Sequence, residues 1–457
     1  MTCERRWKGA WAAIPSGLTA AWLREAFGVA FVTALLFCVS SSNAGSNGAT
    51  VAGLGEAGAV SLSGRGVDAP WGNPATLAWD DDLYVRVVSG SGLIQNDTYT
   101  WHDYGRWNGS SWTEDDKREI LGRVGQGGVH GRFETGLLTP AVAGSGWALT
   151  GRNVQAGELR LPREYVDLVL FGNQLGQSID LPASTGEGLW FFDLAVSHGR
   201  TLGTWREFEI STGATLHWLR GFQYRELLRA GGSLTTDIDA LDGELTAESR
   251  TSEGGTGWAL DIGIALRSSD PEPVPGMSKP GIHGPFEIGL ALRDVAGSIR
   301  WSRSPRMHLD RAYADSVTLA DAEDEDPIET TSQAYPINAF TQSIPAETSL
   351  AAAMWVSEVR LELDWTQGFE AGPLSSTTPR FALGGSYRRW PWLTPRAGLA
   401  FGGVDGPVVA VGARLRFSLF DLDLAYQNVG GVDISLPKGI ALGVALTLRP
   451  LEGRESP

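Results

Sequence analysis

Residues 440–448 read Ile-Ala-Leu-Gly-Val-Ala-Leu-Thr-Leu, so a large apolar residue stands at every second position. Side chains of a β-strand point to the two faces in turn, and this stretch therefore predicts a strand with one continuous apolar face. Residues 408–417 and 420–428 alternate in the same way, but their second face carries charge. Three such strands in succession indicate an antiparallel sheet with one hydrocarbon face and one polar face.

The charges of the two earlier strands suggest how they pair. A tight turn at residues 418–419 would place Arg416 opposite Asp421 and Arg414 opposite Asp423, with apolar residues meeting on the other face. In a soluble sandwich the apolar face would be the core, whereas in a membrane barrel it would face lipid and the ion pairs would line the interior. Alternation alone does not separate these two folds.

Composition narrows the class of protein. The chain has 457 residues, 59 glycines and a formal net charge of -16. Its length fits one large barrel or two to three soluble domains. A strongly acidic chain without a basic stripe argues against a nucleic-acid partner, because phosphate-backbone binding needs positive charge.

The N-terminus has the features of an export signal. Basic residues precede an apolar stretch at 26–39, and small residues follow at 42–44, so we interpret residues 1–44 as a cleaved signal peptide. A retained anchor helix is the alternative. Cys3 and Cys38 both fall in this segment, which leaves the mature chain without a thiol. No later stretch reaches 18 apolar residues, so an integral mature protein would have to be a closed barrel.

Fourteen strand-like runs follow one another along the chain, each long enough to cross a membrane as a tilted strand. Most connections after even-numbered runs are short, whereas those after odd-numbered runs include the longest, 96–127, 159–185, 223–255 and 303–345. Short turns at one rim and long loops at the other are typical of outer-membrane barrels. The runs are 83–95, 128–140, 145–158, 186–200, 206–222, 256–268, 286–302, 346–357, 359–370, 379–390, 393–403, 407–417, 420–428 and 436–449.

Tryptophans gather near both ends of these runs, as amphipathic indoles do at the two membrane interfaces. Toward the long loops lie Trp190, Trp218, Trp258, Trp301 and Trp365, and toward the short turns lie Trp147, Trp205, Trp355, Trp390 and Trp392. Two aromatic girdles favour the membrane barrel over a soluble β-protein.

Several runs repeat the division into an apolar and a charged face, which predicts a barrel interior with charges of both signs. The favoured interpretation is structural: these charges pair across neighbouring strands. The alternative is that they contact a ligand. The candidate inward-facing charges are Asp261, Arg267, Glu287, Arg293, Arg360, Glu362, Asp364, Arg414, Arg416, Asp421 and Asp423.

Residues 45–82 do not read as strands. They are rich in glycine and contain Asn73-Pro74-Ala75, in which Asn73 is a good helix N-cap and Pro74 suits the first helical position. We expect one short helix here, directly before the first strand. The predicted domains are thus a signal peptide (1–44), an N-terminal segment (45–82), an all-β antiparallel transmembrane barrel of about 14 strands (83–449) and a tail (450–457).

The Asn73-Pro74-Ala75 motif, preceded by Asp68 and followed by fourteen predicted strands, resembles the long-chain fatty acid outer-membrane transporter family, the FadL/TodX type. PorV-type barrels share the same pattern. The resemblance implies that residues 45–82 form a hatch inside the barrel, with Asn73, Pro74 and Ala75 as its turn. It also implies passive diffusion of small hydrophobic ligands through a gap that the hatch controls.

Two functions remain open at this point. One is a passive channel for small hydrophobic or amphipathic molecules in the outer membrane of a Gram-negative-type bacterium, in contact with outer-membrane lipid. The other is a PorV-like barrel that docks secreted proteins or supports an envelope assembly. The many charges predicted for the interior leave less apolar lining than a fatty-acid conduit suggests.

The remaining motifs point to no chemistry. Residues 115–124 and 162–172 look helical and could cap the barrel mouth. The carboxylates of residues 321–329 lack the spacing of a calcium loop, so a solvated loop is favoured. None of the six histidines stands in a nucleophile or zinc motif, although His130 and His217 should point inward. We predict no catalytic residue, no cofactor and no metal.

Overall fold

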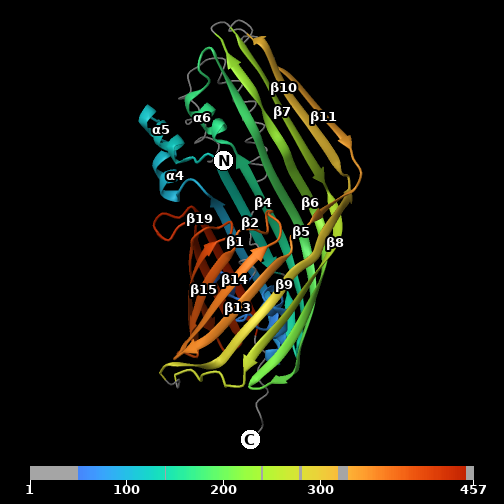
Figure 1. Ribbon diagram of the computed structural model, residues 1–457, viewed down its shortest axis with the longest axis vertical. Helices are drawn as coiled ribbons and strands as arrows, with labels where there is room; N and C mark the ends of the chain where they lie inside the picture. Colours follow the sequence, from blue (N-terminus) through green and yellow to red (C-terminus); the bar gives the residue numbers. More distant parts are fainter. Residues whose placement is uncertain (1–49, 139, 238–239, 277–279, 318–327, 449–457) are drawn as a thin grey trace.

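The computed structural model describes residues 50–138, 140–237, 240–276, 280–317 and 328–448, which form a closed antiparallel barrel of 14 strands (Figure 1). The predicted signal peptide and tail lie outside the described residues. The barrel strands are β1 (Tyr84–Asn96), β2 (Val129–Leu138) with its continuation β3 (Ala141–Gly144), β4 (Trp147–Leu161), β5 (Gln177–Trp205), β6 (Phe208–Thr236), β8 (Gly254–Ser268), β9 (Ile282–Arg303), β13 (Glu347–Val356), β14 (Val359–Gly368), β15 (Arg380–Tyr387), β16 (Leu393–Gly402), β17 (Val408–Arg416), β18 (Phe420–Val429) and β19 (Gly439–Leu448).

The first and last strands close the barrel, because β1 pairs with β19 along its length. Every predicted run overlaps one of these strands, although β5 and β6 extend well beyond the predicted runs 186–200 and 206–222. The predicted hairpin register is confirmed, since Arg414 lies opposite Asp423 and Arg416 opposite Asp421. The alternation of charged and apolar residues was thus enough to predict the register. If the two strands paired one residue out of register, every apolar side chain would point inward.

The apolar side chains form a band on the outer surface. On β19, Leu442 is 57% exposed and Val444 49%, whereas the alternate residues Ala441 and Ala445 are buried. In a closed barrel such exposed faces cannot cover one another, so the band has the character of a surface that meets lipid. Among the described residues, no helix is both long and apolar enough to cross a bilayer.

The aromatic girdles exist, with two exceptions. Trp218 and Trp258 near the loops are about half exposed, as are Trp147 and Trp205 near the short turns. The prediction was wrong for Trp301 and Trp355, whose side chains are buried in the interior. Trp301 has room there because Gly221 and Gly255 stand nearby: a Cβ atom at Gly221 would come within 2.5 Å of its ring.

The loop end of the barrel contains strands that the sequence did not predict. Of the predicted loops 223–255 and 303–345, large parts are strands: β6 continues to Thr236 and pairs with β7 (Leu241–Ser252), which pairs with β10 (Arg306–Val317) and then β11 (Glu329–Pro336). The short β12 (Phe340–Ser343) pairs with β9. These segments lack an apolar row long enough for lipid, so period-two counting passed over them.

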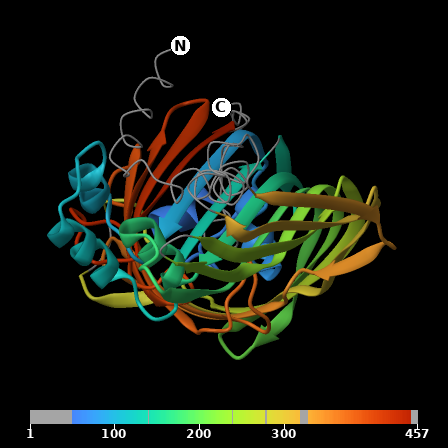
Figure 2. The ribbon, with the colours of Figure 1, turned by 90° about the horizontal axis from the view of Figure 1, so that it is seen from above.

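Three helices also lie at the loop end: α4 (Trp101–Trp107), α5 (Glu114–Arg123) and α6 (Arg163–Phe171). The predicted helices at 115–124 and 162–172 correspond to α5 and α6. Trp107, Ile120 and Leu170, one from each helix, pack into one apolar cluster. Figure 2 shows the helices on one side of the barrel mouth and the β7–β10–β11 sheet on the opposite side.

Residues 50–83, named here the inner segment, lie within the barrel. They contain a turn of α-helix, α3 (Val51–Gly55), and two 3-10 helices, η2 (Gly66–Trp71) and η3 (Pro74–Trp79). The predicted N-cap is present, since the Asn73 side chain accepts a hydrogen bond from the Ala75 backbone N–H at 3.0 Å. The segment thus contains three short helices rather than one.

Candidate functional site

The inner segment touches the wall of the barrel backbone to backbone, at glycines. On one side, a Cβ atom at Gly412 would lie 2.9 Å from the α-carbon of Gly55, and one at Gly398 would lie 2.3 Å from the carbonyl carbon of Glu56. On the other side, a Cβ atom at Gly213 would lie 2.3 Å from the carbonyl carbon of Pro74. Because these wall positions carry no side chain, the segment packs directly on the strands.

The Asn73-Pro74-Ala75 turn is fastened to the wall by its first residue. The Asn73 side-chain amide donates to the backbone carbonyls of Ile264, at 3.1 Å, and of Leu290, at 3.3 Å. Its oxygen caps η3, as described above. Gly263 and Gly289 leave space for this amide, and the Ala75 side chain is fully buried. One asparagine therefore ties η3 to two neighbouring strands, β8 and β9.

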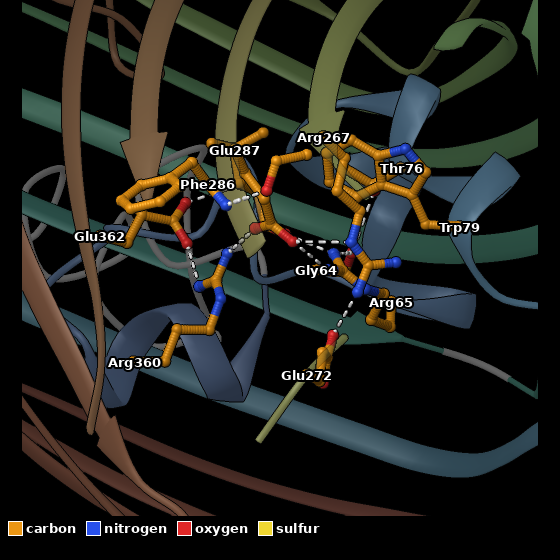
Figure 3. A network of polar contacts seen from close by, with 12 residues as sticks. Gly64, Arg65, Thr76, Trp79, Arg267, Glu272, Phe286, Glu287, Arg360 and Glu362 are labelled. Carbon is orange, nitrogen blue, oxygen red and sulfur yellow. Dashed lines mark hydrogen bonds and ion pairs between the residues drawn. The ribbon is translucent and has the colours of Figure 1, made fainter. Parts of the chain in front are cut away.

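Charged side chains of the wall make further ties, and Figure 3 shows the largest group. Glu287 of β9 accepts from Arg65 of the inner segment at 3.1 Å and from Arg360 of β14 at 2.5 Å. Arg360 also pairs with Glu362 at 2.6 Å, and Arg267 lies 3.4 Å from Glu287. The indole of Trp79 packs against the guanidinium of Arg65, whose Cζ atom lies 5.0 Å from the ring centre. Paired charge of both signs thus occupies this part of the lumen.

Wall carboxylates also accept hydrogen bonds from the backbone of the inner segment. The N–H groups of Val60 and Ser61 donate to Asp364, at 3.1 and 3.0 Å, and the N–H of Leu62 donates to Glu362 at 2.6 Å. Asp364 accepts both of its bonds through one oxygen, and Glu362 accepts one bond. They give the non-helical part of the segment, between α3 and η2, partners for its buried N–H groups.

A second ionic group holds the segment on the side of β1 and β16–β18. Asp68 accepts two hydrogen bonds from Arg86, at 2.8 and 2.9 Å. Arg396 lies 3.2 Å from Glu56 and 2.7 Å from Asp423. Asp423 also pairs with Arg414 at 2.9 Å, which continues the network along β17 and β18.

A buried histidine lies beside the inner segment. The two ring nitrogens of His217 lie 2.9 and 3.0 Å from carboxylate oxygens of Asp193 and Asp261. A carboxyl group at each ring nitrogen thus links His217 of β6 to Asp193 of β5 and to Asp261 of β8. The ring centre of Trp71 lies 5.9 Å away, and the backbone carbonyl of Trp71 accepts from Arg293 at 3.0 Å.

The loop-side half of the lumen is filled differently. Apolar side chains, including those of Phe191, Leu219 and Trp301, pack together there, out of contact with solvent. Beneath them is a cavity of about 30 Å³, room for about two water molecules. The cavity has an apolar and a charged side, and is lined by Arg152, Val154, Phe191, Asp193, Leu219, Arg293, Asp294, Ile344, Pro345, Glu347 and Leu374.

The structure gathers most of the predicted lumen charges around the inner segment. Two clusters result: Arg267, Glu287, Arg360 and Glu362; and Arg414, Asp421 and Asp423. Asp261 instead binds His217, and Arg293 lines the cavity. Asp364 binds the segment's backbone, and Arg293 pairs with Glu347. Arg416 is set apart, since its side chain is 41% exposed and lies 3.8 Å from Asp421.

Sequence reasoning missed the residues that make the segment fit. Gly384, Gly398 and Gly412 stand on the inward face of successive strands, and this repetition of glycine on a polar face is a signal that could have found them. It also missed Arg65 and Arg86, whose partners are 222 and 18 residues away in the sequence. Among the described residues, no group of three or more His, Cys, Asp or Glu side chains could hold a metal ion.

Comparisons with known proteins give structural matches alone. No protein-family model and no curated protein sequence matches the chain. A FadL homologue from Pseudomonas aeruginosa is 16% identical, with a TM-score of 0.46 over 89% of this chain and 99% of its own. The Ralstonia pickettii toluene transporter TbuX is 11% identical, with a TM-score of 0.42 over 84% of this chain and 94% of its own. The monoaromatic hydrocarbon channel CymD is 12% identical, with a TM-score of 0.43 over 88% and 96%.

Proposed function

We propose that this chain is an outer-membrane channel through which small apolar or amphipathic molecules diffuse passively, with the inner segment as its hatch. The apolar cluster in the loop-side lumen carries this proposal. A barrel that passes hydrophilic solutes keeps a polar, water-filled interior, whereas here Phe191, Leu219 and Trp301 line and close it. An apolar lining next to a few charged groups suits a ligand of the same character.

Passage requires side chains to move, because the cavity below the cluster is far smaller than an aromatic hydrocarbon. Rotamer changes of residues such as Leu219 and Ile344 would enlarge it toward the loops. On the short-turn side of the cavity the path reaches the inner segment. A ligand would pass beside this segment only where some of its hydrogen bonds and ion pairs to the barrel wall break. In this proposal Asn73, Pro74 and Ala75 anchor the hatch, and the lumen charges hold it in place rather than contact the ligand.

Nothing in this proposal needs catalysis or a cofactor. A cleaved signal peptide at residues 1–44 would deliver the chain to the outer membrane, where its apolar band would contact lipid. The predicted alternative, a barrel that docks secreted proteins, makes a different prediction, because it requires no flux of any solute.

Flux through reconstituted vesicles tests the proposal. We expect the refolded chain to admit toluene faster than empty vesicles do, and to exclude arabinose. Leu219→Ala should raise toluene flux, because it removes a side chain that lines the cavity; Leu216→Ala, on the lipid face of the same strand, is the matched control. Equal passage of both solutes would indicate a general pore, and passage of neither would favour the docking barrel. Heat-modifiable gel mobility would show that each variant is folded.

A further inference from the structure

Two rows of arginine and threonine cross the outer surface beyond the barrel's loop-side rim. In the first row, Thr256 of β8 lies between Arg220 of β6 and Arg300 of β9. In the second, Thr251 of β7 lies between Arg225 of β6 and Arg306 of β10. Each row therefore sets a hydroxyl between two guanidinium groups on strands about 10 Å apart.

Both rows face away from the lumen. Arg220 lies opposite Phe192 and follows Trp218 by two residues, and Trp218 is half exposed on the lipid-facing side. Side chains two residues apart in a strand share a face. In the second row, Thr251 hydrogen-bonds His308 at 3.1 Å, whereas its neighbour Arg250 points the other way and stacks on Phe340.

The first row lies at the height of lipid headgroups. Trp218 and Trp258 belong to the loop-side aromatic girdle, and tryptophans in such girdles sit at the membrane interface. Arg220 and Thr256 are each two residues further toward the loops, about 7 Å along the strands. The second row lies a further 13 Å or so along β6, when the bulge at Phe222 is allowed for.

Three of the four arginines have no acidic partner among the described residues. In the part of the chain that the structure describes, no ion pair involves Arg220, Arg300 or Arg306. By contrast, Arg229 of β6 pairs with Glu248 at 3.2 Å, and Arg311 of β10 pairs with Glu244 at 2.9 Å. The guanidinium groups of Arg220, Arg300 and Arg306 are thus available to an external anion, although the chain as a whole has a net charge of -16.

We propose that the two rows bind the phosphates of an anionic glycolipid in the loop-side leaflet. Guanidinium groups match phosphate geometry through paired hydrogen bonds, and in the first row the hydroxyl of Thr256 adds a donor between them. The spacing of the rows is too large for one phosphate but fits an extended headgroup with several. Glu253, exposed at the β7–β8 junction between the rows, would oppose binding. This surface is outside the lumen, so the inference does not depend on the proposed transport.

Titration with fluorescently labelled lipopolysaccharide tests the inference, on the refolded full chain in zwitterionic detergent. We expect the first-row variant Arg220→Gln/Arg300→Gln to weaken binding, by about fivefold for each arginine removed. The second-row variant Arg225→Gln/Arg306→Gln should weaken it further when the two are combined, and Glu253→Gln should strengthen it. The control Arg229→Gln/Arg311→Gln removes the same charge from residues with acidic partners and should change binding less than twofold.

Four outcomes would overturn the inference. Equal weakening by the control variant would show a general charge effect, and unchanged binding in the four-arginine variant would place the lipid elsewhere. Competition by millimolar inorganic phosphate would reveal a site for free phosphate. Phosphatidylglycerol, with one phosphate, serves as the last comparison: if it binds as tightly as lipopolysaccharide, the two rows do not act on one headgroup. Heat-modifiable mobility confirms that each variant is folded.

Discussion

The two halves of the lumen are closed in different ways. In the short-turn half, the backbone of the inner segment lies on wall glycines such as Gly213 and Gly398, and ion pairs fasten it around the circumference. In the loop-side half, large apolar side chains of the wall itself meet across the lumen. Buried side chains can change rotamer one at a time, whereas releasing the segment requires many bonds to break together. The loop-side half is therefore the adaptable closure, and the short-turn half is the fixed one.

The contacts at glycines should be the hardest to disturb. Gly213→Ala combined with Gly398→Ala would place methyl groups 2.3 Å from backbone atoms of the inner segment, which neither a rotamer change nor a small shift can relieve. We expect the pair to lower the free energy of unfolding by about 2–6 kcal/mol if the two sites add. Chemical denaturation in lipid, followed by tryptophan fluorescence, measures this.

Gly131→Ala is the matched control for these glycines. It also replaces a strand glycine of the wall, but a Cβ atom there meets nothing within 4 Å. Its effect should stay within about 0.5 kcal/mol. If the control and the double variant were equally destabilised, strand propensity and not the fit of the segment would explain the loss.

The buried ion pair between Asp68 and Arg86 should come next in size. Both side chains are almost fully buried, so Arg86→Met leaves a carboxylate in the interior without its partner. We expect a loss of about 3–5 kcal/mol. The double variant Asp68→Asn/Arg86→Met should be more stable than Arg86→Met alone, because no charge is then stranded. A double variant that is worse than the single one would mean that the pair itself, and not the stranded charge, matters.

A substitution at Asn73 separates its two roles, as the N-cap of η3 and as an anchor to the barrel wall. Aspartate caps a helix as well as asparagine does, so a pure cap would tolerate Asn73→Asp. Here the side-chain amide donates to two wall carbonyls, and a carboxylate would face the same oxygens without a donor. We expect Asn73→Asp to cost about 1–3 kcal/mol, measured by the same denaturation series. The control is the exposed Asn108→Asp, which adds the same charge at the C-terminal end of α4 and should cost less than about 1 kcal/mol.

The sequence predicted the wall of the barrel better than it predicted the contents of the lumen. The strands and their faces were predictable, because each lipid-facing row must be continuous hydrocarbon and strands alternate with a period of two. The girdle prediction was wrong for Trp301 and Trp355, because it used only the position of a tryptophan near the end of a strand. It took no account of space inside the barrel, such as the space that Gly221 leaves for Trp301. Period-two counting also missed β7, β10 and β11, which lie beyond the lipid-facing rows.

The fastening of the inner segment was beyond the reach of pattern reasoning. Val60 and Asp364 are 304 residues apart in sequence, and nothing local to either residue indicates the other. The sequence identified Glu362 and Asp364 as inward charges by their alternation, but whether their partner would be a strand, a ligand or the segment depends on three-dimensional packing. Repeated glycine on an inward face is the one local sign that another backbone must approach there.

The smallest expected effect comes from the two ion pairs of the β17–β18 hairpin, which share one register but differ in burial. Asp423 is buried and lies 2.9 Å from Arg414, whereas Arg416 is 41% exposed and lies 3.8 Å from Asp421. Reversing Arg416 and Asp421 separately and together should give a coupling energy of about 0–1 kcal/mol, because water screens the outer pair. The same cycle on Arg414 and Asp423 should give a larger value. Coupling in neither cycle would contradict the register, and equal coupling in both would show that burial does not set the strength of these pairs.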